Sequence, residues 1–108
     1  FKLEFIEINC IKAWRGIGWC SFISQKYEQA MKYYEKIIKQ KPLAIDYMNA
    51  GHVAWVMGDI QKAAVFYGKA ITASGNRERF LEMFHKDEES LLTQGIREED
   101  IPLMLDLL

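Results

Sequence analysis

The hydrophobic positions of this chain recur at helical spacing. Between residues 12 and 24, Trp14, Ile17, Gly18 and Ser21 fall at positions i, i+3, i+4 and i+7, which is the stripe of a helix packed on one side. No run of alternating apolar and polar residues is long enough to indicate a strand. The pattern therefore predicts an all-α chain.

Helix-breaking residues divide this pattern into segments. Pro42 prevents continuation of the second segment, and Gly58, Gly75 and Gly95 follow the third, fourth and fifth as glycine stop signals. Asp59 suits the N-cap of the fourth. The predicted helices span residues 12–24, 26–40, 43–57, 60–74, 77–93 and 101–108. The first four form two helical hairpins.

The two hairpins repeat each other in one constant register. The matched pairs are Gly18 with Gly51, Ala30 with Ala63, and Tyr34 with Tyr67, and the two members of each pair are separated by the same interval. A fixed period in this range indicates a solenoid built from one supersecondary unit. Two antiparallel helices approach closely only where bulky side chains are missing, so we expect each glycine to face the alanine of its own hairpin.

These positions resemble the tetratricopeptide repeat, a helix-turn-helix unit of about 34 residues. Matching residues in the first unit are Trp14, Ile17, Gly18, Tyr27, Ala30, Tyr34, Ile37 and Pro42. Those in the second are Tyr47, Ala50, Gly51, Gly58, Ile60, Ala63, Tyr67 and Ala70. The sequence departs from the family at Ser21 and Ala54 in place of a larger residue, at Gln25 in place of Gly, and at Gly75 in place of Pro. The resemblance implies a right-handed α-solenoid of helix-turn-helix hairpins with a helical C-terminal cap.

The same register gives the organisation of the chain, which is one domain. Residues 1–10 are expected to be the remnant second helix of an upstream repeat, 11–43 and 44–76 the two repeats, and 77–108 the capping helices. In this register Leu3 takes the position at which the second helix of a repeat usually has a small residue. We therefore expect the chain to begin inside an earlier repeat and to be the C-terminal portion of a longer array. An end exposed at Phe1 and Leu3 would allow a homodimer.

Composition and charge narrow the classes of partner. The chain has 108 residues, of which 27% are charged, and a formal net charge of −1. Without an excess of Lys and Arg to neutralise phosphates, we expect no nucleic-acid ligand. No stretch approaches the roughly 18 uncharged apolar residues of a membrane span, so we expect no membrane partner. The compartment is left open, with the cytoplasm as the first expectation.

The resemblance also implies a binding groove. In the family, the first helix of each unit lines the concave face, which in this sequence corresponds to Lys12, Arg15, Trp19, Phe22, Ile23, Ile45, Met48, Asn49, His52, Trp55 and Val56. We expect a peptide or helix of a protein partner to be anchored on Trp19, Phe22, Met48 and Trp55, with Lys12 and Arg15 favouring an acidic flank. The alternative is a structural spacer or cap of a longer array, in which the groove is packed in cis by the apolar terminal helix or by upstream repeats.

One narrower family function is not favoured. Chaperone-binding members hold a peptide C-terminus with a carboxylate clamp of Lys, Asn, Asn, Lys and Arg. Arg15 could replace the first Lys and Asn49 matches one Asn, but Trp19 stands where the other Asn belongs. Because a charge-assisted clamp needs all its donors, we expect no such clamp.

No motif indicates catalysis, a cofactor or a metal. The residues Cys10, Cys20, His52 and His85 are scattered over different turns, without the spacing of zinc ligands or of a nucleophile with its base. His52 is expected to be a hydrogen-bonded groove or surface histidine, and residues 86–89 a solvated helix face. The sequence thus predicts a binding module and not an enzyme.

Overall fold

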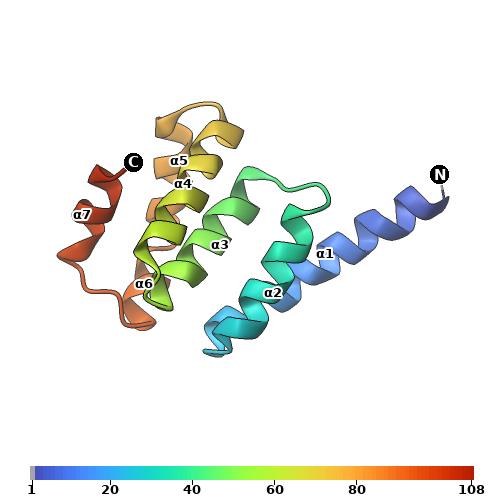
Figure 1. Cartoon of the computed structure of the whole chain (residues 1–108), viewed down its shortest axis with the longest axis horizontal. Coiled ribbons are helices and arrows are strands. Elements are labelled where there is room, and N and C mark those ends of the chain that lie inside the picture. The colour runs from blue at the N-terminus through green and yellow to red at the C-terminus, as the bar shows by residue number, and fades with distance from the viewer. Residues whose placement is uncertain (1) are drawn as a thin grey trace.

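The chain folds into helices alone wherever it is described. The computed structural model describes residues 2–108, with side chains from residue 8 onward. Their helices are α1 (Lys2–Ile23), α2 (Tyr27–Ile38), α3 (Ala44–Val56), α4 (Ile60–Ser74), α5 (Arg77–Lys86), α6 (Glu88–Thr93) and α7 (Asp100–Asp106). Figure 1 shows these helices following one another across the molecule, with the two chain ends at opposite sides.

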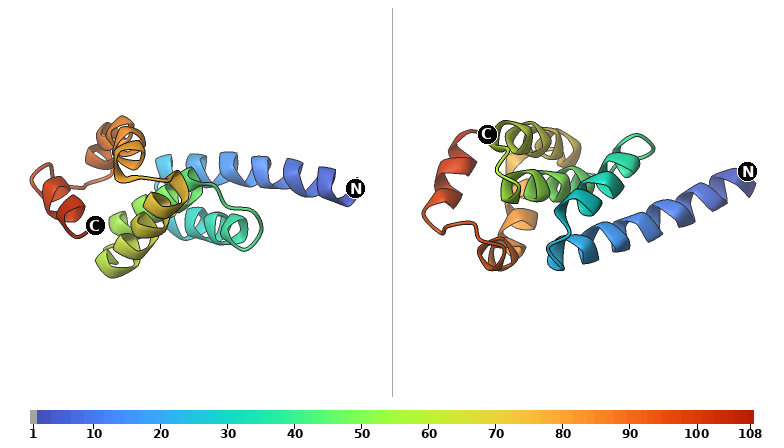
Figure 2. Two further views of the ribbon diagram at one scale, coloured as in Figure 1. Left: turned by 90° about the horizontal axis from the view of Figure 1, so that it is seen from above. Right: turned by 60° about the horizontal axis from the view of Figure 1, so that its bottom comes forward.

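Consecutive helices pack against each other in chain order, from α1 on α2 through to α4 on α5. The molecule is correspondingly elongated, with extents of 47 × 30 × 22 Å. The N-terminal part of α1 projects beyond the other helices in both views of Figure 2. The expected α-solenoid of helical hairpins is therefore confirmed.

The first helix is longer than predicted. α1 runs without interruption from Lys2 to Ile23, although a separate remnant helix was expected over residues 1–10. The sequence has neither Gly nor Pro before Gly16, so nothing local ends a helix at residue 10. The side chains of Phe1 and Leu3, on which the homodimer expectation depends, lie outside the described residues.

The fifth predicted helix is divided in two. A single helix over 77–93 was expected, but α5 ends at Lys86 and α6 begins at Glu88. At the break, the amide of Asp87 donates to the carbonyl of Phe84, 2.9 Å away, which tightens the last turn of α5. The Asp87 carboxylate turns instead toward His52 of α3. A tertiary contact that no local pattern encodes thus accompanies the break.

A tyrosine packed on a glycine joins the two helices of each hairpin. A Cβ atom added to Gly18 would lie 3.0 Å from Cζ of Tyr34, and one added to Gly51 would lie 2.7 Å from Cε1 of Tyr67. Both tyrosines are fully buried. The side chain nearest to each glycine is therefore a tyrosine ring and not the alanine expected from the sequence.

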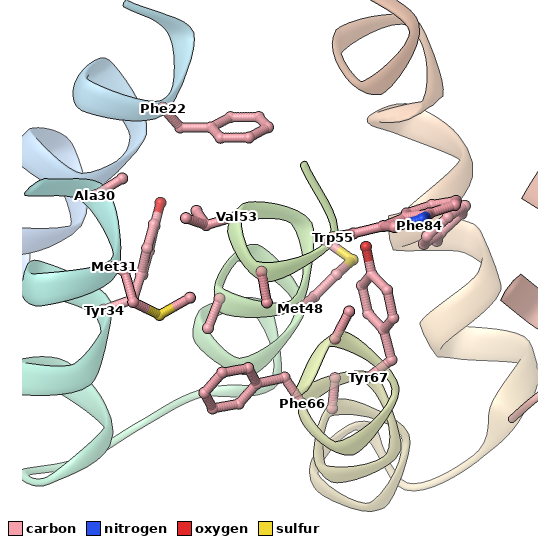
Figure 3. Packing of buried hydrophobic residues seen from close by; sticks show 14 of the residues in the cluster. Phe22, Ala30, Met31, Tyr34, Met48, Val53, Trp55, Phe66, Tyr67 and Phe84 are labelled. Atoms are coloured by element: carbon pink, nitrogen blue, oxygen red, sulfur yellow. The ribbon is translucent and has the colours of Figure 1, made fainter. Parts of the chain in front are cut away.

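Aromatic rings continue this packing into the C-terminal helices. Tyr67 of α4 lies with its ring centroid 5.8 Å from that of Phe80 and 5.6 Å from that of Phe84, both on α5. Figure 3 shows Tyr67 extending from its helix toward Phe84, beside Trp55. Phe80 and Phe84 are fully buried. The core is thus continuous from the second hairpin into α5.

We predict that Gly51→Ala destabilises the protein by up to about 2 kcal/mol. The overpacking cost of roughly 1–3 kcal/mol against the enclosed Tyr67 ring exceeds the helix-propensity gain of about 1 kcal/mol. Gly68→Ala is the matched control, because nothing lies within 4 Å of its added Cβ, and it should stabilise by up to about 1 kcal/mol. Urea unfolding of both variants measures the difference, and equal effects would contradict the tyrosine packing.

The turns of the two hairpins give a second prediction. Gln25 has a φ of 64°, and Gly58, at the equivalent position of the second hairpin, has a φ of 91°. A left-handed backbone costs a non-glycine residue roughly 1–2 kcal/mol, of which the greater freedom of unfolded glycine offsets about 0.5–1. Gln25→Gly should therefore stabilise by about 0.5–1 kcal/mol and Gly58→Gln destabilise by a similar amount. Thermal unfolding tests the pair, and the prediction fails if both substitutions shift the midpoint in the same direction.

Candidate functional site

The structure places four of the expected groove residues in the core. The side chains of Phe22, Met48, His52 and Trp55 are between 0% and 7% exposed. His52 stacks edge-on against Phe84 of α5, with centroids 5.5 Å apart. The expectation that all these side chains line one open groove is therefore corrected, because much of the α3 surface is covered by the chain's own C-terminal helices.

Three other expected residues lie away from any shared groove. Lys12 is exposed on α1, and Val56 packs partly buried against the core. Ile23, at the end of α1, lines a shallow depression with residues of α6. Gln94 crosses to this point, where its side-chain amide donates to the Ile23 carbonyl over 3.4 Å and its oxygen accepts from the Tyr27 hydroxyl. The residue that follows α6 therefore contacts the turn of the first hairpin.

The remaining expected residues come together in one groove. Its volume is about 340 Å³, and it lies between α1 and α3 with the α5–α6 break at one edge. The residues lining it are Arg15, Gly16, Trp19, Ile45, Asp46, Asn49 and Asp87. Among the described residues, the open part of the surface formed by the first helices of the two repeats is thus the groove between α1 and α3.

An ion pair forms part of this groove. The Arg15 guanidinium donates to both carboxylate oxygens of Asp46, from Nε over 2.7 Å and from Nη2 over 2.8 Å. This pairing raises the pKa of Arg15. Asp46 is fully buried and also accepts from the backbone amide of Leu43, 2.7 Å away, which caps the start of α3. The charge of Arg15 is therefore already compensated inside the chain.

A buried histidine holds the other edge of the groove. The His52 ring contacts the Tyr67 hydroxyl through Nδ1 at 2.6 Å and the Asp87 carboxylate through Nε2 at 3.0 Å. Burial lowers the pKa of His52, although the Asp87 carboxylate acts against this shift. In the neutral ring, Nε2–H donates to Asp87 and Nδ1 accepts from Tyr67, so every polar atom has a partner. His52 thereby joins α3, α4 and the α5–α6 break.

The first hairpin has no equivalent of this network. Trp19 occupies the position that His52 has in the second unit, and Tyr34 occupies the position of Tyr67. The Tyr34 hydroxyl is buried without a hydrogen-bond partner among the described residues, as is the Oδ1 atom of Asn49. Burial raises the pKa of Tyr34, so its hydroxyl keeps its proton. In the first hairpin, the buried tyrosine hydroxyl therefore lacks the histidine partner that Tyr67 has in the second.

Sequence reasoning missed three residues of the groove. Gly16 was overlooked because a glycine supplies no side chain to recognise. Asp46 lies three residues after Leu43, the position from which a carboxylate reaches back to cap a helix, and that spacing could have identified it. Asp87 was assigned to a solvated helix face over residues 86–89, which is corrected because its carboxylate binds the fully buried His52.

Metal-binding side chains do not cluster in the described part of the molecule. Among the residues with described side chains, no three His, Cys, Asp or Glu residues are arranged to hold a metal ion. Within residues 2–108, no helix is both long enough and apolar enough to cross a membrane.

Comparison with known proteins supports the repeat assignment. A family model for the tetratricopeptide repeat matches residues 11–42 and 47–77. These two matches fall on the α1–α2 and α3–α4 hairpins. No curated protein and no solved structure matches the chain.

The His52 network predicts an acid-sensitive fold. The pKa of His52 is lowered in the folded state, so the unfolded chain takes up the proton first as the pH falls below its ordinary value of about 6.5. Stability should therefore decrease as the pH falls below about 6.5, with a slope of up to about 1.4 kcal/mol per pH unit from this group. Urea unfolding as a function of pH measures the slope.

The two histidines provide the comparison for this measurement. In His52→Gln the slope should largely vanish between about pH 6.5 and 5, whatever the stability of the variant. In His85→Gln, which removes an exposed histidine, the slope should persist. An unchanged slope in His52→Gln would show that other groups cause the acid sensitivity.

Proposed function

The chain belongs to the tetratricopeptide repeat family, whose repeats generally mediate binding between proteins, and we propose that it binds an extended segment of a partner protein in the groove between α1 and α3. The family is typically a non-catalytic interaction module, and the proposed role is likewise binding without chemistry. The observation that carries the proposal is the open groove itself, which lies between the first helices of two consecutive repeats.

The lining of this groove suits a peptide with one apolar anchor. Trp19 and Ile45 offer apolar surface, and Trp19 is supported from behind by Phe22, with ring centroids 5.4 Å apart. Asn49 lines the same groove, and its side-chain Nδ2 can donate to a backbone carbonyl of an extended peptide, whereas its Oδ1 atom is buried. A volume of about 340 Å³ lies at the small end of the range for ligand sites, which favours one anchor residue over several.

The charges of the groove favour a cation beside the anchor. Arg15 and Asp46 compensate each other, and neutral His52 leaves the charge of Asp87 uncompensated at the groove edge. This replaces the acidic flank that Lys12 and Arg15 suggested from the sequence. A Lys or Arg of the partner placed near Asp87 would complement that charge.

A second candidate function is a spacer or cap of a longer array. The observation in its favour is the burial of Met48, His52 and Trp55 in this chain, because α3 is then partly occupied from within. Under this alternative the groove beside α1 would hold no partner. The two functions differ in whether that groove binds a peptide selectively.

The test selects binders from a displayed library of random peptides and compares two glycine variants. Nothing lies within 4 Å of a Cβ added at Gly16 or at Gly68, so Gln at either position should fold. Gly16 lines the groove, whereas Gly68 lies on α4 away from it. Selected peptides should bind Gly16→Gln at least tenfold more weakly than the unmodified chain, a loss of about 1.4 kcal/mol, because the new side chain fills the groove.

Gly68→Gln is the control and should bind the same peptides with unchanged affinity by calorimetry. Asn49→Ala should weaken binding by about 1 kcal/mol, the contribution of one hydrogen bond. If the library yields no peptide, or if both glycine variants bind alike, the groove proposal fails and the spacer function is favoured.

A further inference from the structure

A second and larger groove lies at the C-terminal end of the solenoid. It has a volume of about 460 Å³ and runs between α7 and the beginning of α4. Its apolar lining is formed by Trp55, Ile60, Leu103, Met104 and Leu107. This groove shares no residue with the groove between α1 and α3.

The apolar side chains at this end are unusually exposed. Leu103 and Leu107 are each 62% exposed and Ile60 is 53% exposed, whereas Trp55 and Met104 form the buried floor. α7 and its C-cap present Leu103 and Leu107 at positions i and i+4, on the same face of the helix. Exposed leucines around a buried aromatic floor are typical of a surface that binds another chain.

The charge of this region is acidic. Asp100 and Asp106 complete the lining of the groove, and neither forms an ion pair with a described residue. Of the nearby arginines, Arg97 pairs with Glu99, whereas Arg77 donates to the Leu105 carbonyl over 3.0 Å and keeps its charge. Residues 97–108, which include α7, contain four Asp or Glu and one Arg, a formal net charge of −3. A cationic partner is therefore attracted to this end.

We propose that the groove between α7 and α4 is a second docking surface, which binds an amphipathic segment of another protein carrying an apolar side chain flanked by Lys or Arg. The apolar side chain enters between Ile60 and Leu103 over the Trp55 floor. The cations lie against Asp100 and Asp106, at either end of α7. Because Asp100 and Asp106 lie on either side of Leu103 along α7, the surface selects for the order of charges as well as for their sign.

The experiment uses the full chain and short fluorescent peptides as probes. The first probe is an amphipathic Leu and Lys peptide, and the others are the same composition in scrambled order and a Leu and Glu peptide of the same pattern. Fluorescence anisotropy gives each affinity. The amphipathic Leu and Lys peptide should bind at least tenfold more tightly than either of the others.

Surface variants locate the binding. The double variant Leu103→Gln, Leu107→Gln changes exposed side chains only, and it should weaken binding of the amphipathic Leu and Lys peptide at least tenfold. Asp100→Asn with Asp106→Asn should weaken it several-fold and reduce its salt dependence. The control is Val65→Gln, at a residue 57% exposed on α4 outside this groove, and it should bind as the unmodified chain does. Circular dichroism confirms that each variant is folded.

Three results would overturn the proposal. Equal binding of the ordered and scrambled peptides would indicate attraction by net charge alone. Equal binding by the unmodified chain and the leucine variant would place the peptide elsewhere. Concentration-dependent dimerisation that the leucine variant abolishes, measured by sedimentation equilibrium without peptide, would make a second copy of this chain the occupant. The groove between α1 and α3 keeps all its residues in these variants, so its own test is independent.

Discussion

Each hairpin depends on a tyrosine ring lying against a bare stretch of the opposite helix. Tyr34 occupies the space above Gly18, and Tyr67 occupies the space above Gly51, so that any side chain at either glycine would meet a ring that is fully buried. The contact sets how closely the two helices of a unit approach. It also sets where the second helix presents its tyrosine hydroxyl. Because both units contain this tyrosine–glycine contact, the repeat in the sequence produces a repeat in the three-dimensional structure.

The tyrosine hydroxyl that this packing positions has different surroundings in the two units. In the second, Tyr67 reaches His52, whose other nitrogen binds Asp87, and the C-terminal helices are thereby attached to the concave side of α3. In the first, the equivalent Tyr34 hydroxyl finds no partner among the described residues, and Trp19 stands where a histidine would be needed. The two units thus differ in having Trp19 or His52 at the same repeat position. The concave face is open at Trp19 and covered at His52.

The open surfaces differ in chemistry and so in the partners that they suit. Beside α1, the charges of Arg15 and Asp46 cancel. The shape of the groove and the side-chain amide of Asn49 therefore decide which peptide fits. Beside α7, the exposed Leu103 and Leu107 line a groove together with Asp100 and Asp106, neither of which forms an ion pair with a described residue. The two surfaces have no lining residue in common, so one chain could hold two partner segments at once.

The sequence by itself determined the repeat, because periodic apolar positions, turn glycines and the matched tyrosines are local signals that survive in any helical hairpin. It predicted the ends of the helices between Tyr27 and Ser74 to within a few residues. It also identified Arg15, Trp19 and Asn49 as groove residues. Only the tertiary structure decided which of the expected groove positions remain accessible, since burial depends on helices far along the chain. The hydrogen bond between His52 and Asp87 joins residues on different helical segments, and no spacing in the sequence predicts it. Exposure is a property of the whole packed molecule, whereas helical period is a property of neighbouring residues.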